Sequence, residues 1–474
     1  MTSNIKPKTI FTGDNLPIMR GMNSESVDLI YLDPPFNSNA NYAAPIGSKA
    51  AGAEFKDTWT LDDVDNAWLD LIETKYPALN RIIHAAMTNS DKSYLIYMAA
   101  RLLEMKRILK DAGSIYLHCD PTMSHYLKLV MDAVFGKANF RNEVVWKRTS
   151  TKSLAKRYAV NTDRILYYTK SNGATWNQQY APYDDEYIQK TFRGRDKHGR
   201  YGTENLSGGK AGSRRAYMPL KGIEPPPGRA WAPPARNKFP ASAQALLPDN
   251  YEDLDQLSKC EVLDDAGLLH WTKGKIGRPR WKKYLSAMPG IVAGDLVLDT
   301  PPVKGKEGTG YPTQKPLALL DRIIKASSNE GDVVLDPFCG CATTCVAADR
   351  LQRDWIGIDI SGKAAELVVE RIKADQGLFQ EIIARTDIPK RTDLGDIPRY
   401  NAPQNKTQLY GEQEGYCNGC GEHFQMRHLE LDHIIAETSG GTDHIENLQL
   451  LCSHCNRVKG DRGQEYLISR LNER

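Results

Sequence analysis

Two short, largely apolar segments, each ending in an acidic, proline-containing loop, most constrain the fold of this chain. Residues 27–32 (VDLIYL) run into the loop at 33–36 (DPPF), and residues 332–335 (DVVL) run into 336–341 (DPFCGC). Runs of this kind are typical of strands buried in a parallel sheet. Helical patterns surround them, which predicts a doubly wound α/β domain. In such sheets ligands bind beyond the carboxyl ends of the strands, where both loops fall.

The length and composition of the chain limit its domain number and compartment. At 474 residues it is too long for one ordinary domain, so two or three are expected. Charged residues make up 26% and hydrophobic residues 41%, a soluble globular composition. No apolar run approaches the roughly 20 residues of a membrane helix, and the N-terminal sequence MTSNIKPKTI lacks the apolar stretch of a signal peptide. We therefore expect a cytoplasmic protein without a membrane partner.

The net charge of +3 hides an uneven distribution of charge along the chain. Between Lys147 and Lys238 there are 19 Lys and Arg residues against 7 Asp and Glu residues, interleaved with Trp, Tyr and Phe. A segment of this kind can follow the phosphate backbone of a nucleic acid. The alternative is a solvated basic surface.

Shifts in composition divide the chain into five segments. Residues 149–298 contain Gly-Gly and Pro-Pro-Pro sequences and interrupt the strand–helix alternation, as an inserted, loop-rich module does. Residues 385–408 are polar and proline-containing, which is typical of a linker. The predicted segments are two halves of the α/β domain at 1–148 and 299–384, the insert at 149–298, the linker at 385–408 and a compact module at 409–474.

The first loop, Asp33-Pro34-Pro35-Phe36, carries groups suited to chemistry on an exocyclic amine of a nucleobase. Such an amine is a poor nucleophile because its lone pair is delocalised into the ring, and it needs acceptors for its N–H hydrogens. The Asp33 carboxylate and the Pro34 carbonyl can accept them from a backbone made rigid by the two prolines. Phe36 offers a face on which an extruded base can stack. Alone, the tetrapeptide could equally be a turn after a strand.

The second loop predicts a site for a nucleoside cofactor. Asp336, Phe338 and Gly340 lie between a strand and a predicted helix, so this backbone can wrap the amino-acid end of such a cofactor. Roughly 20 residues later a second strand ends at Asp359, from where a carboxylate can reach ribose hydroxyls. Asp14 likewise follows a short apolar run. Each signal is weak alone, but together they favour an enzyme.

From about residue 8 to residue 375 the chain resembles the β-class DNA amino-methyltransferases. The resemblance rests on SVDLIYLDPPFN, GSIYLHCD, NEVVWKR, DRILYYTK, GYPTQKP and VLDPFCGCATT, which occur in that family's order, with the catalytic motif first and the cofactor motif last. It implies a Rossmann-like domain that binds S-adenosylmethionine and flips a base out of double-stranded DNA, with residues 149–298 as the target-recognition region. The implied cofactor contacts are Thr313, Lys315, Asp336, Phe338, Gly340 and Asp359, with Asp14 near the adenine ring of the cofactor.

Two residues refine what this resemblance implies. Within the class, an aspartate such as Asp33 at the start of the catalytic loop favours adenine N6 over cytosine N4, without excluding cytosine. Where the cofactor loop of the family usually has a second glycine, this chain has Ala342. If that position needs a positive φ, a Cβ there costs free energy. Because alanine is the smallest intrusion, we expect the pocket to survive.

The C-terminal module contains two C-x2-C pairs. In a chain without a secretion signal, this spacing favours a tetrahedral zinc site over disulfides. A module of about 60 residues also needs such a staple, because it buries too little core alone. The predicted zinc ligands are Cys417, Cys420, Cys452 and Cys455.

Within this cysteine frame, the sequence resembles the HNH (ββα-metal) nucleases over about residues 409–470. The resemblance implies that His433 is the general base that activates water and that Asn447 orients the loop of this histidine. It also implies that Asp432 and Asn456 hold a Mg2+ or Mn2+ ion on the scissile phosphate. The alternative is a zinc-stapled module that binds DNA without cutting it.

These features together predict a fused enzyme, an adenine-N6 DNA methyltransferase with an HNH endonuclease, of a bacterial or phage restriction–modification kind. One alternative is a DNA methyltransferase, adenine-N6 or cytosine-N4, whose HNH module only binds DNA. Another is a methyltransferase that acts on RNA or protein, since similar loops occur there. The basic insert and the HNH module both favour DNA. Cutting both strands commonly needs two HNH copies, which would favour a homodimer.

Overall fold

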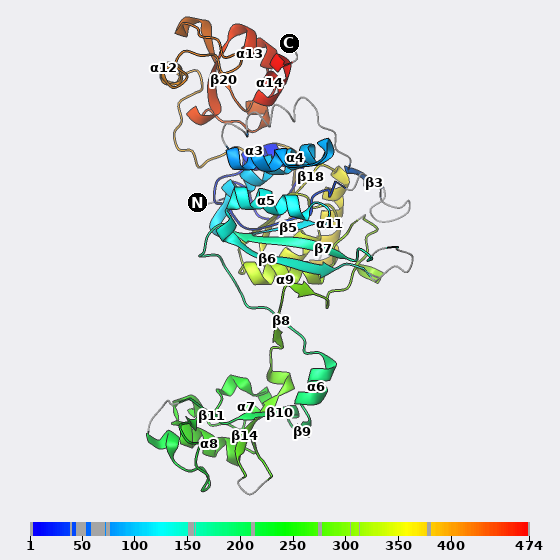
Figure 1. Ribbon diagram of the computed structural model, residues 1–474, viewed down its shortest axis with the longest axis vertical. Helices are drawn as coiled ribbons and strands as arrows, with labels where there is room; N and C mark the ends of the chain where they lie inside the picture. Colours follow the sequence, from blue (N-terminus) through cyan, green and yellow to red (C-terminus); the bar gives the residue numbers. More distant parts are fainter. Residues whose placement is uncertain are drawn as a thin grey trace. The chain divides into compact units, whose positions relative to one another are not determined.

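A nine-stranded sheet forms the centre of the α/β domain. The computed structural model describes residues 3–37, 40–43, 54–57, 72, 76–149, 156, 158–209, 214–273, 277–303, 305–311, 313–376 and 381–472. Neighbouring strands of the sheet are parallel, except that β7 runs antiparallel to both β5 and β6 (Figure 1). The strands lie in the order β16 (Leu296–Val297), β6 (Phe140–Lys147), β7 (Thr162–Thr169), β5 (Leu109–Cys119), β2 (Val27–Leu32), β17 (Val333–Asp336), β18 (Asp354–Asp359), β1 (Thr9–Thr12) and β19 (Ile383–Arg385).

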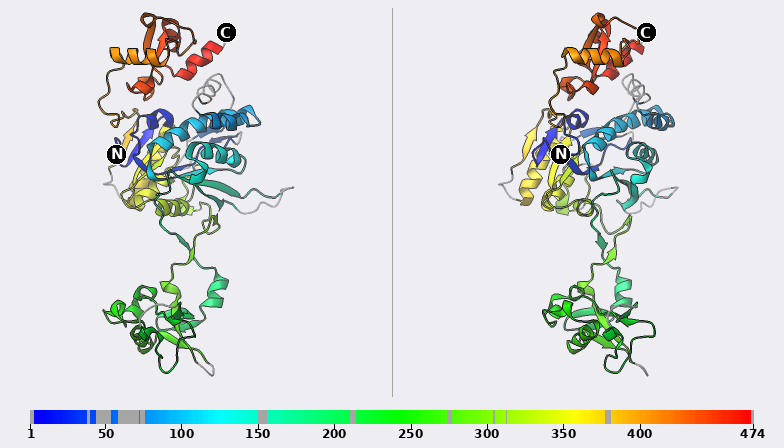
Figure 2. Two further views of the ribbon diagram at one scale, coloured as in Figure 1. Left: turned by 60° about the vertical axis from the view of Figure 1, so that its left-hand side comes forward. Right: turned by 90° about the vertical axis from the view of Figure 1, so that its left-hand side faces the viewer.

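Helices cover both faces of this sheet, which confirms the predicted doubly wound α/β class (Figure 2). Successive residues of β2 enter two different cores, because side chains alternate across a strand: Ile30 and Leu32 face one helix layer, whereas Leu29 and Tyr31 face the other. Within the described ranges, no helix is both long enough and apolar enough to cross a membrane. The first layer contains α1 (Asn15–Arg20), α3 (Pro77–His84), α4 (Asn89–Ile108) and α5 (Ser124–Phe135), and the second contains α9 (Leu317–Ser327), α10 (Thr343–Arg350) and α11 (Gly362–Gln376).

The two loops predicted to carry chemistry meet at the point where the direction of the sheet reverses. From β2 the chain passes through α4 to β5 on one side, and from β17 it passes through α10 to β18 on the other. Right-handed crossovers in opposite directions put their helices on opposite faces, and this opens a crevice beyond the strand ends. Because β2 and β17 are parallel neighbours, with Leu29 opposite Val334, both loops leave the sheet at this crevice.

Residues 178–293 form a separate compact unit with a core of its own. Its antiparallel sheet has the order β13-β14-β10-β9, and the large aromatic residues Trp231, Phe239 and Trp281 are buried in the core. The elements of the unit are β8 (Tyr180–Ala181), α6 (Asp185–Thr191), β9 (Gly194–Asp196), β10 (Gly199–Asn205), β11 (Ser207–Gly208), β12 (Ala230–Trp231), α7 (Ala241–Gln244), α8 (Gln256–Asp265), β13 (Leu269–Trp271), β14 (Pro279–Tyr284) and β15 (Ile291–Val292).

The predicted insert at 149–298 is longer than this unit. Strand β7 lies inside the predicted range, yet it pairs with β5 and β6 in the large sheet, as does β16 with β6. The apolar side chains of β7, such as Ile165 and Leu166, are fully buried there. The insert therefore begins after β7 and not directly after β6.

The C-terminal module is a small ββα unit with its own apolar core. Helix α12 begins at Pro403, inside the predicted linker at 385–408. Earlier in that range, Thr392 accepts a hydrogen bond from Asn23 at 2.9 Å, and Asp393 accepts one from the backbone N–H of Ser24 at 2.8 Å. Polar composition predicted a free linker here, but its side chains bind the α/β domain instead. The elements of the module are α12 (Pro403–Glu412), β20 (Leu429–His433), β21 (Leu448–Cys452), α13 (Ser453–Lys459) and α14 (Gln464–Asn472).

Candidate active site

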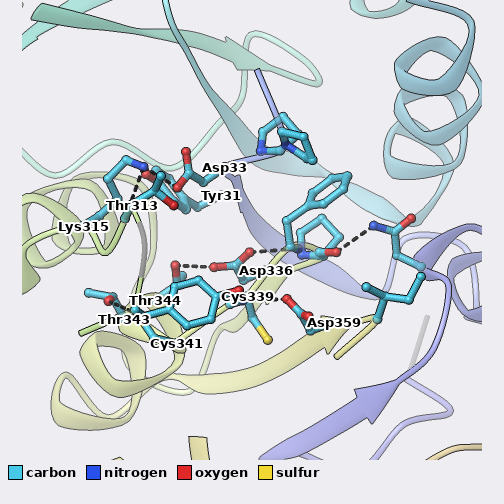
Figure 3. Close-up of a pocket in the computed structure, with 18 of the residues that line it drawn as sticks. Tyr31, Asp33, Thr313, Lys315, Asp336, Cys339, Cys341, Thr343, Thr344 and Asp359 are labelled. Carbon is cyan, nitrogen blue, oxygen red and sulfur yellow. Dashed lines mark hydrogen bonds and ion pairs between the residues drawn. The ribbon is translucent and has the colours of Figure 1, made fainter. Parts of the chain in front are cut away.

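A cavity of about 700 Å³ occupies the crevice at the reversal point of the sheet (Figure 3). It is lined by the loop after β2, the loop after β17, the segment before α9 and the start of α1. Every residue that the sequence assigned to the catalytic loop or to the cofactor lines this one cavity. These residues are Asp14, Asp33, Pro34, Pro35, Phe36, Thr313, Lys315, Asp336, Phe338, Gly340 and Asp359.

The two carboxylate oxygens of Asp33 differ in their contacts with other residues. Its Oδ2 forms an ion pair with the ammonium group of Lys315, which also donates to the carbonyl of Thr313 at 3.1 Å. Its Oδ1 is buried and has no hydrogen-bond partner among the described residues. Lys315 is 282 positions away in the sequence, so its contact with Asp33 could not be predicted from the motif alone. The Asp33 carboxylate at the cavity therefore has one oxygen held by Lys315 and one oxygen without a partner among the described residues.

Two carboxylates shape the loop after β17. Asp336 accepts hydrogen bonds from the Thr344 hydroxyl at 2.5 Å and from the Phe338 N–H at 3.1 Å. Asp359 accepts them from the N–H groups of Gly340 and Ser361 at 2.8 and 2.9 Å. Burial raises the pKa of both groups, and the pKa of Asp336 rises to about 7. The loop is therefore held by acidic groups that also face the cavity.

The raised pKa of Asp336 makes stability depend on pH. Between the ordinary pKa of 3.8 and about 7, the unfolded chain has lost this proton while the folded protein keeps it. The group therefore lowers folded-state stability as pH rises through this window, by up to about 1.4 kcal/mol per pH unit. We compare the thermal midpoint of Asp336→Asn with that of wild type at each pH. The difference, variant minus wild type, should increase between pH 4.5 and pH 7. Thermal unfolding at several pH values without added ligand measures this difference, and a difference that does not change with pH would contradict it.

Ala342, which replaces a family glycine, does adopt the left-handed conformation, with φ of 61° and ψ of 31° at the start of α10. The left-handed conformation costs a non-glycine residue roughly 1 kcal/mol of free energy. The Ala342 methyl group is fully buried in the core beside α10, and burial of one such group contributes about 0.8 kcal/mol. The two effects are close to balance, so the loop keeps its shape. At Gly340, by contrast, an added Cβ would lie 3.0 Å from the ring of Tyr311.

Arg101 connects the loop after β1 to the cavity wall, and sequence analysis did not identify it. Its guanidinium donates to Asp14 at 2.8 Å and to Asn15 at 2.7 Å, and Asn15 in turn donates to the carbonyl of Pro337 at 2.7 Å. Arg101 is 6% exposed and its charge lies 3.3 Å from the centre of the Tyr97 ring. The available signal was an arginine on the apolar face of a long helix. Asp14 therefore lies at the cavity, with its carboxylate held by this arginine.

The HNH module places the predicted base beside a second acid. The Nε2 atom of His433, at the end of β20, lies 2.9 Å from the carboxylate of Asp443. Asn447 accepts from the N–H of Ile435 at 2.9 Å and donates to the carbonyls of Ile435 and Thr442. Asn447 thus ties together the loop that follows His433. Asp443 was not identified from the sequence.

The predicted ligands of the nuclease ion, Asp432 and Asn456, contact other protein groups in this structure. Asp432 forms an ion pair with the buried Lys459 at 3.0 Å, and Asn456 donates to Glu430 at 2.6 Å. Glu430 and Asp432 are two residues apart on β20, so they share the strand face against which α13 packs. An oxygen-rich group of this kind fits a hard divalent cation. Glu430 is a second carboxylate there, and the two-residue spacing from Asp432 was its sequence signal.

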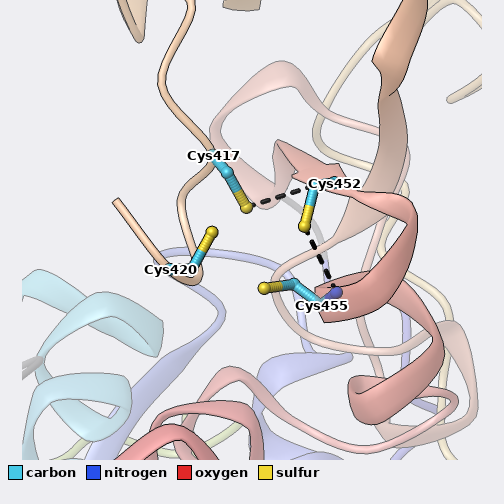
Figure 4. Close-up of side chains that lie close together, drawn as sticks. All are labelled: Cys417, Cys420, Cys452 and Cys455. Carbon is cyan, nitrogen blue, oxygen red and sulfur yellow. Dashed lines mark hydrogen bonds between the residues drawn. The ribbon is translucent and has the colours of Figure 1, made fainter. Parts of the chain in front are cut away.

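The four predicted zinc ligands come together in the C-terminal module (Figure 4). The Sγ atoms of all four lie within 4.8 Å of one another, and the sulfur of Cys417 also accepts the backbone N–H of Cys452 at 3.1 Å. Among the described residues this is the only such group of histidine, cysteine and acidic side chains. Four thiolates from two C-x2-C pairs fit a tetrahedral Zn2+ ion. The set is Cys417, Cys420, Cys452 and Cys455.

We expect one zinc ion per chain and a C-terminal module that depends on it. Removing the ion with a strong chelator should unfold the module, because binding and folding of a small metal domain are one process. Elemental analysis measures the metal content, and limited proteolysis should show cleavage of the region 409–472 after chelation. The separate Cys260→Ser change, in the core of the inserted unit, should leave the metal content at one. A protein that is purified without zinc and resists proteolysis would contradict the prediction.

The sheet, the paired loops and the ββα unit define the class of the protein, an α/β methyltransferase-type domain joined to a nuclease-type module. The chain belongs to the DNA methylase family, which it matches over residues 27–370. Residues 417–462 match the HNH endonuclease family, so the chain also carries an HNH domain.

Several DNA methyltransferases are similar to this chain over most of its length. The type II methyltransferase M.EcaI of Enterobacter cloacae is 29% identical over 421 residues, which cover 87% of this chain and 80% of that protein. The DNA adenine methyltransferase YhdJ of Escherichia coli K12 is 23% identical over 398 residues, covering 82% and 93%. Among solved structures, M1.HpyAVI in complex with SAM is 16% identical, with a TM-score of 0.35 and coverage of 78% of this chain and 99% of that chain.

Proposed function

We propose that this protein methylates adenine N6 in specific sequences of double-stranded DNA, with S-adenosylmethionine as the methyl donor. The unpartnered Oδ1 atom of Asp33, a residue that lines the cavity, is the observation that carries the proposal, because this oxygen can accept a hydrogen bond. An adenine amine that donates one N–H to this atom can direct its nitrogen lone pair away from the ring. Lys315 keeps the other oxygen of the same carboxylate in place. The geometry of the acceptor is then set before the substrate arrives.

The residues of the cavity fit S-adenosylmethionine by their chemistry. When bound, this cofactor supplies a methyl group activated by a sulfonium centre. Asp359 lies at the end of β18 and suits ribose hydroxyls, whereas Asp336 and the loop around Gly340 suit the charged amino-acid end. The aromatic ring of Phe338 lies 6.4 Å from that of Tyr97, and both line the cavity. A volume of about 700 Å³ accommodates a nucleoside cofactor together with a base.

Adenine and DNA are favoured over the alternatives by separate observations. The carboxylate of Asp33 favours adenine over cytosine within the class, and the similar protein YhdJ is named a DNA adenine methyltransferase. The inserted unit at 178–293 and the excess of 19 basic over 7 acidic residues between 147 and 238 suit the phosphate backbone. We assign sequence recognition to the inserted unit.

The test of this proposal is a map of modified bases. Genomic DNA without methylation is incubated with the purified protein and S-adenosylmethionine, and is then sequenced by a method that detects N6-methyladenine and N4-methylcytosine. We expect N6-methyladenine in one short motif. N4-methylcytosine would overturn the choice of base. Methyl transfer to RNA or protein, with no modified base in the DNA, would overturn the substrate class.

We further propose that the HNH domain cleaves DNA. The imidazole of His433 lies next to the carboxylate of Asp443, which supports its role as a general base. Asp432, Asn456 and Glu430 would hold a Mg2+ or Mn2+ ion, which supplies positive charge at the scissile phosphate. The alternative, a module that only binds DNA, predicts no cut with either metal on methylated or unmethylated DNA. Cutting both strands commonly needs two HNH copies, and we therefore expect a homodimer on DNA.

A further inference from the structure

A line of buried polar side chains runs from the cavity across the ends of three neighbouring strands. The hydroxyl of Tyr31 on β2 lies 2.9 Å from Nδ1 of His118 on β5. The Nε2 atom of His118 lies 3.2 Å from the carboxylate of Asp163 on β7. None of the three is more than 1% exposed. Beyond Asp163, the half-exposed Arg148 forms an ion pair at 3.2 Å, so the line reaches from the cavity to the protein surface.

The strand register explains why these residues meet. Tyr31 pairs with Tyr116 across β2 and β5, and His118 follows Tyr116 on the same face two residues later. His118 pairs with Ile165 across β5 and β7, and Asp163 is again two residues away on that face. All three side chains therefore stand on one face at the edge of the sheet that carries the cavity.

The partners of His118 fix the direction of the hydrogen bonds. A carboxylate can only accept, so in a neutral imidazole the Nε2 atom facing Asp163 carries the hydrogen and Nδ1 keeps a lone pair. Tyr31 must then donate its hydroxyl hydrogen to Nδ1. Burial, and then the charge of Asp33, raise the pKa of Tyr31 well above its ordinary value, so the phenol stays neutral. Tyr31 is also one of the residues that line the cavity, and its oxygen keeps lone pairs that can accept a proton.

Aromatic packing holds the imidazole of His118 directly under the catalytic loop. The ring of Phe36 is stacked with that of His118, with centroids 5.9 Å apart and an angle of 16° between the planes. The indole of Trp146 on β6 meets the imidazole edge-on at 5.9 Å. The charged groups around this histidine are Asp163 with Arg148 on one side, and Asp33 with Lys315 on the cavity side. A rotation of the imidazole is therefore opposed from each side.

The proposed reaction requires a proton acceptor, and this line of residues can supply one. An amine nitrogen that gains a methyl group becomes a cation and must lose one of its two protons. Asp33 is a poor final acceptor of this proton, because its carboxylate is already paired with the positively charged Lys315. The cavity therefore needs a second base that can take a proton from a group facing the substrate.

We propose that Tyr31, His118 and Asp163 form the proton acceptor of the methyl-transfer reaction; this inference rests on the proposed methyltransferase function. The N–H bond of the methylated amine breaks and its proton forms an O–H bond with the Tyr31 oxygen. At the same time, the original hydroxyl proton of Tyr31 moves to Nδ1 of His118. The products are a neutral methylamine and an imidazolium, which the adjacent carboxylate of Asp163 stabilises. Tyr31 is the catalytic residue of this set, whereas His118 and Asp163 act through it.

Tyr31→Phe tests the first step against a closely matched control. Tyr116 lies beside Tyr31 on the same sheet face and is equally buried, but its hydroxyl bonds to Ser327 at 2.6 Å and does not line the cavity. We expect Tyr31→Phe to reduce the single-turnover rate of methyl transfer about 100-fold, the scale of general acid–base catalysis. Tyr116→Phe should stay within threefold of wild type, and both variants should bind S-adenosylmethionine as wild type does. Equal rates for the two variants would overturn the proposal and leave the proton on Asp33.

A pH profile and a spectroscopic measurement separate a proton relay from a purely structural role. The wild-type single-turnover rate should fall in acid, because a protonated His118 cannot accept a proton, and His118→Gln should lose this decline. Nitrogen-15 spectra of histidine-labelled protein, assigned with His118→Gln, should show His118 protonated at Nε2 only. Protonation at Nδ1 in wild type, or an unchanged acid limb in His118→Gln, would overturn the relay. The spectrum is independent of catalysis, whereas a wild-type protein that never transfers a methyl group would refute the proposed function.

Discussion

Replacing Asp33 with alanine is expected to reduce methyl transfer to DNA by roughly 100- to 1,000-fold, the usual cost of losing one preorganised polar group at a reacting centre. The reason is the loss of the free Oδ1 acceptor, which no other described residue replaces at that position. Binding of S-adenosylmethionine should persist, because the cofactor loop after β17 is held by its own hydrogen bonds. Single-turnover transfer of a labelled methyl group measures the first effect, and calorimetry measures the second.

Asp28 provides a matched control for this change. It lies on β2, the strand that leads into Asp33, and is likewise paired with a lysine, Lys110, at 2.8 Å, but it does not line the cavity. Asp28→Ala should therefore lower thermal stability without changing the rate of methyl transfer by more than a few-fold. If Asp33→Ala and Asp28→Ala had the same rate, Asp33 would be a structural residue and the assignment of the catalytic loop would be wrong.

The second large effect is expected in the HNH domain. His433→Ala should reduce DNA cleavage in Mg2+ or Mn2+ by about 100- to 10,000-fold, because a positioned general base commonly contributes that much. Since the carboxylate of Asp443 can only accept, a neutral imidazole carries its hydrogen on Nε2, which leaves Nδ1 as the nitrogen that can take a proton from water. Nicking of a supercoiled plasmid measures this loss, and methyl transfer by the same variant should be unchanged.

Two further variants make this test specific. Asp443→Asn should also slow cleavage, because an amide can reverse the tautomer of His433 and remove the lone pair from Nδ1. His454→Ala, at an exposed position on α13, should cut as wild type does. Cleavage by His433→Ala at the wild-type rate would refute the assignment of the base. If the metal-loaded wild-type protein cuts neither methylated nor unmethylated DNA, the endonuclease function itself fails.

The local residues of the site were predictable from the sequence, whereas its long-range partners were not. Asp33 and Asp336 each follow an apolar run, and the rules for parallel sheets place such loops at one edge. The pairing of β2 with β17 then brings them together. The contacts of Lys315 with Asp33 and of His118 with Tyr31 depend on strand order and register, which no local pattern fixes.

The errors in the predicted segments have a common physical cause. The predicted insert at 149–298 included β7, which continues the sheet by antiparallel pairing, although DRILYYTK in the same segment carries part of the family resemblance. The polar stretch at 385–408 had the composition of a linker, yet Thr392 and Asp393 satisfy polar groups of Asn23 and Ser24. Composition describes the solubility of a segment but not the partners that its side chains find.

The pairing of β8 with β15 has a consequence for how this enzyme can change during evolution. Ile291 and Val292 lie opposite Ala181 and Tyr180, so the two ends of the inserted unit are neighbours. A segment whose ends meet can be replaced by another of different length without moving the strands that flank it. With sequence recognition in the inserted unit, as proposed, recombination at these two points would change the recognised sequence without changing the residues around the cavity or in the HNH domain. New sequence specificities could then arise by exchange of one whole module, with no need for coordinated point mutations.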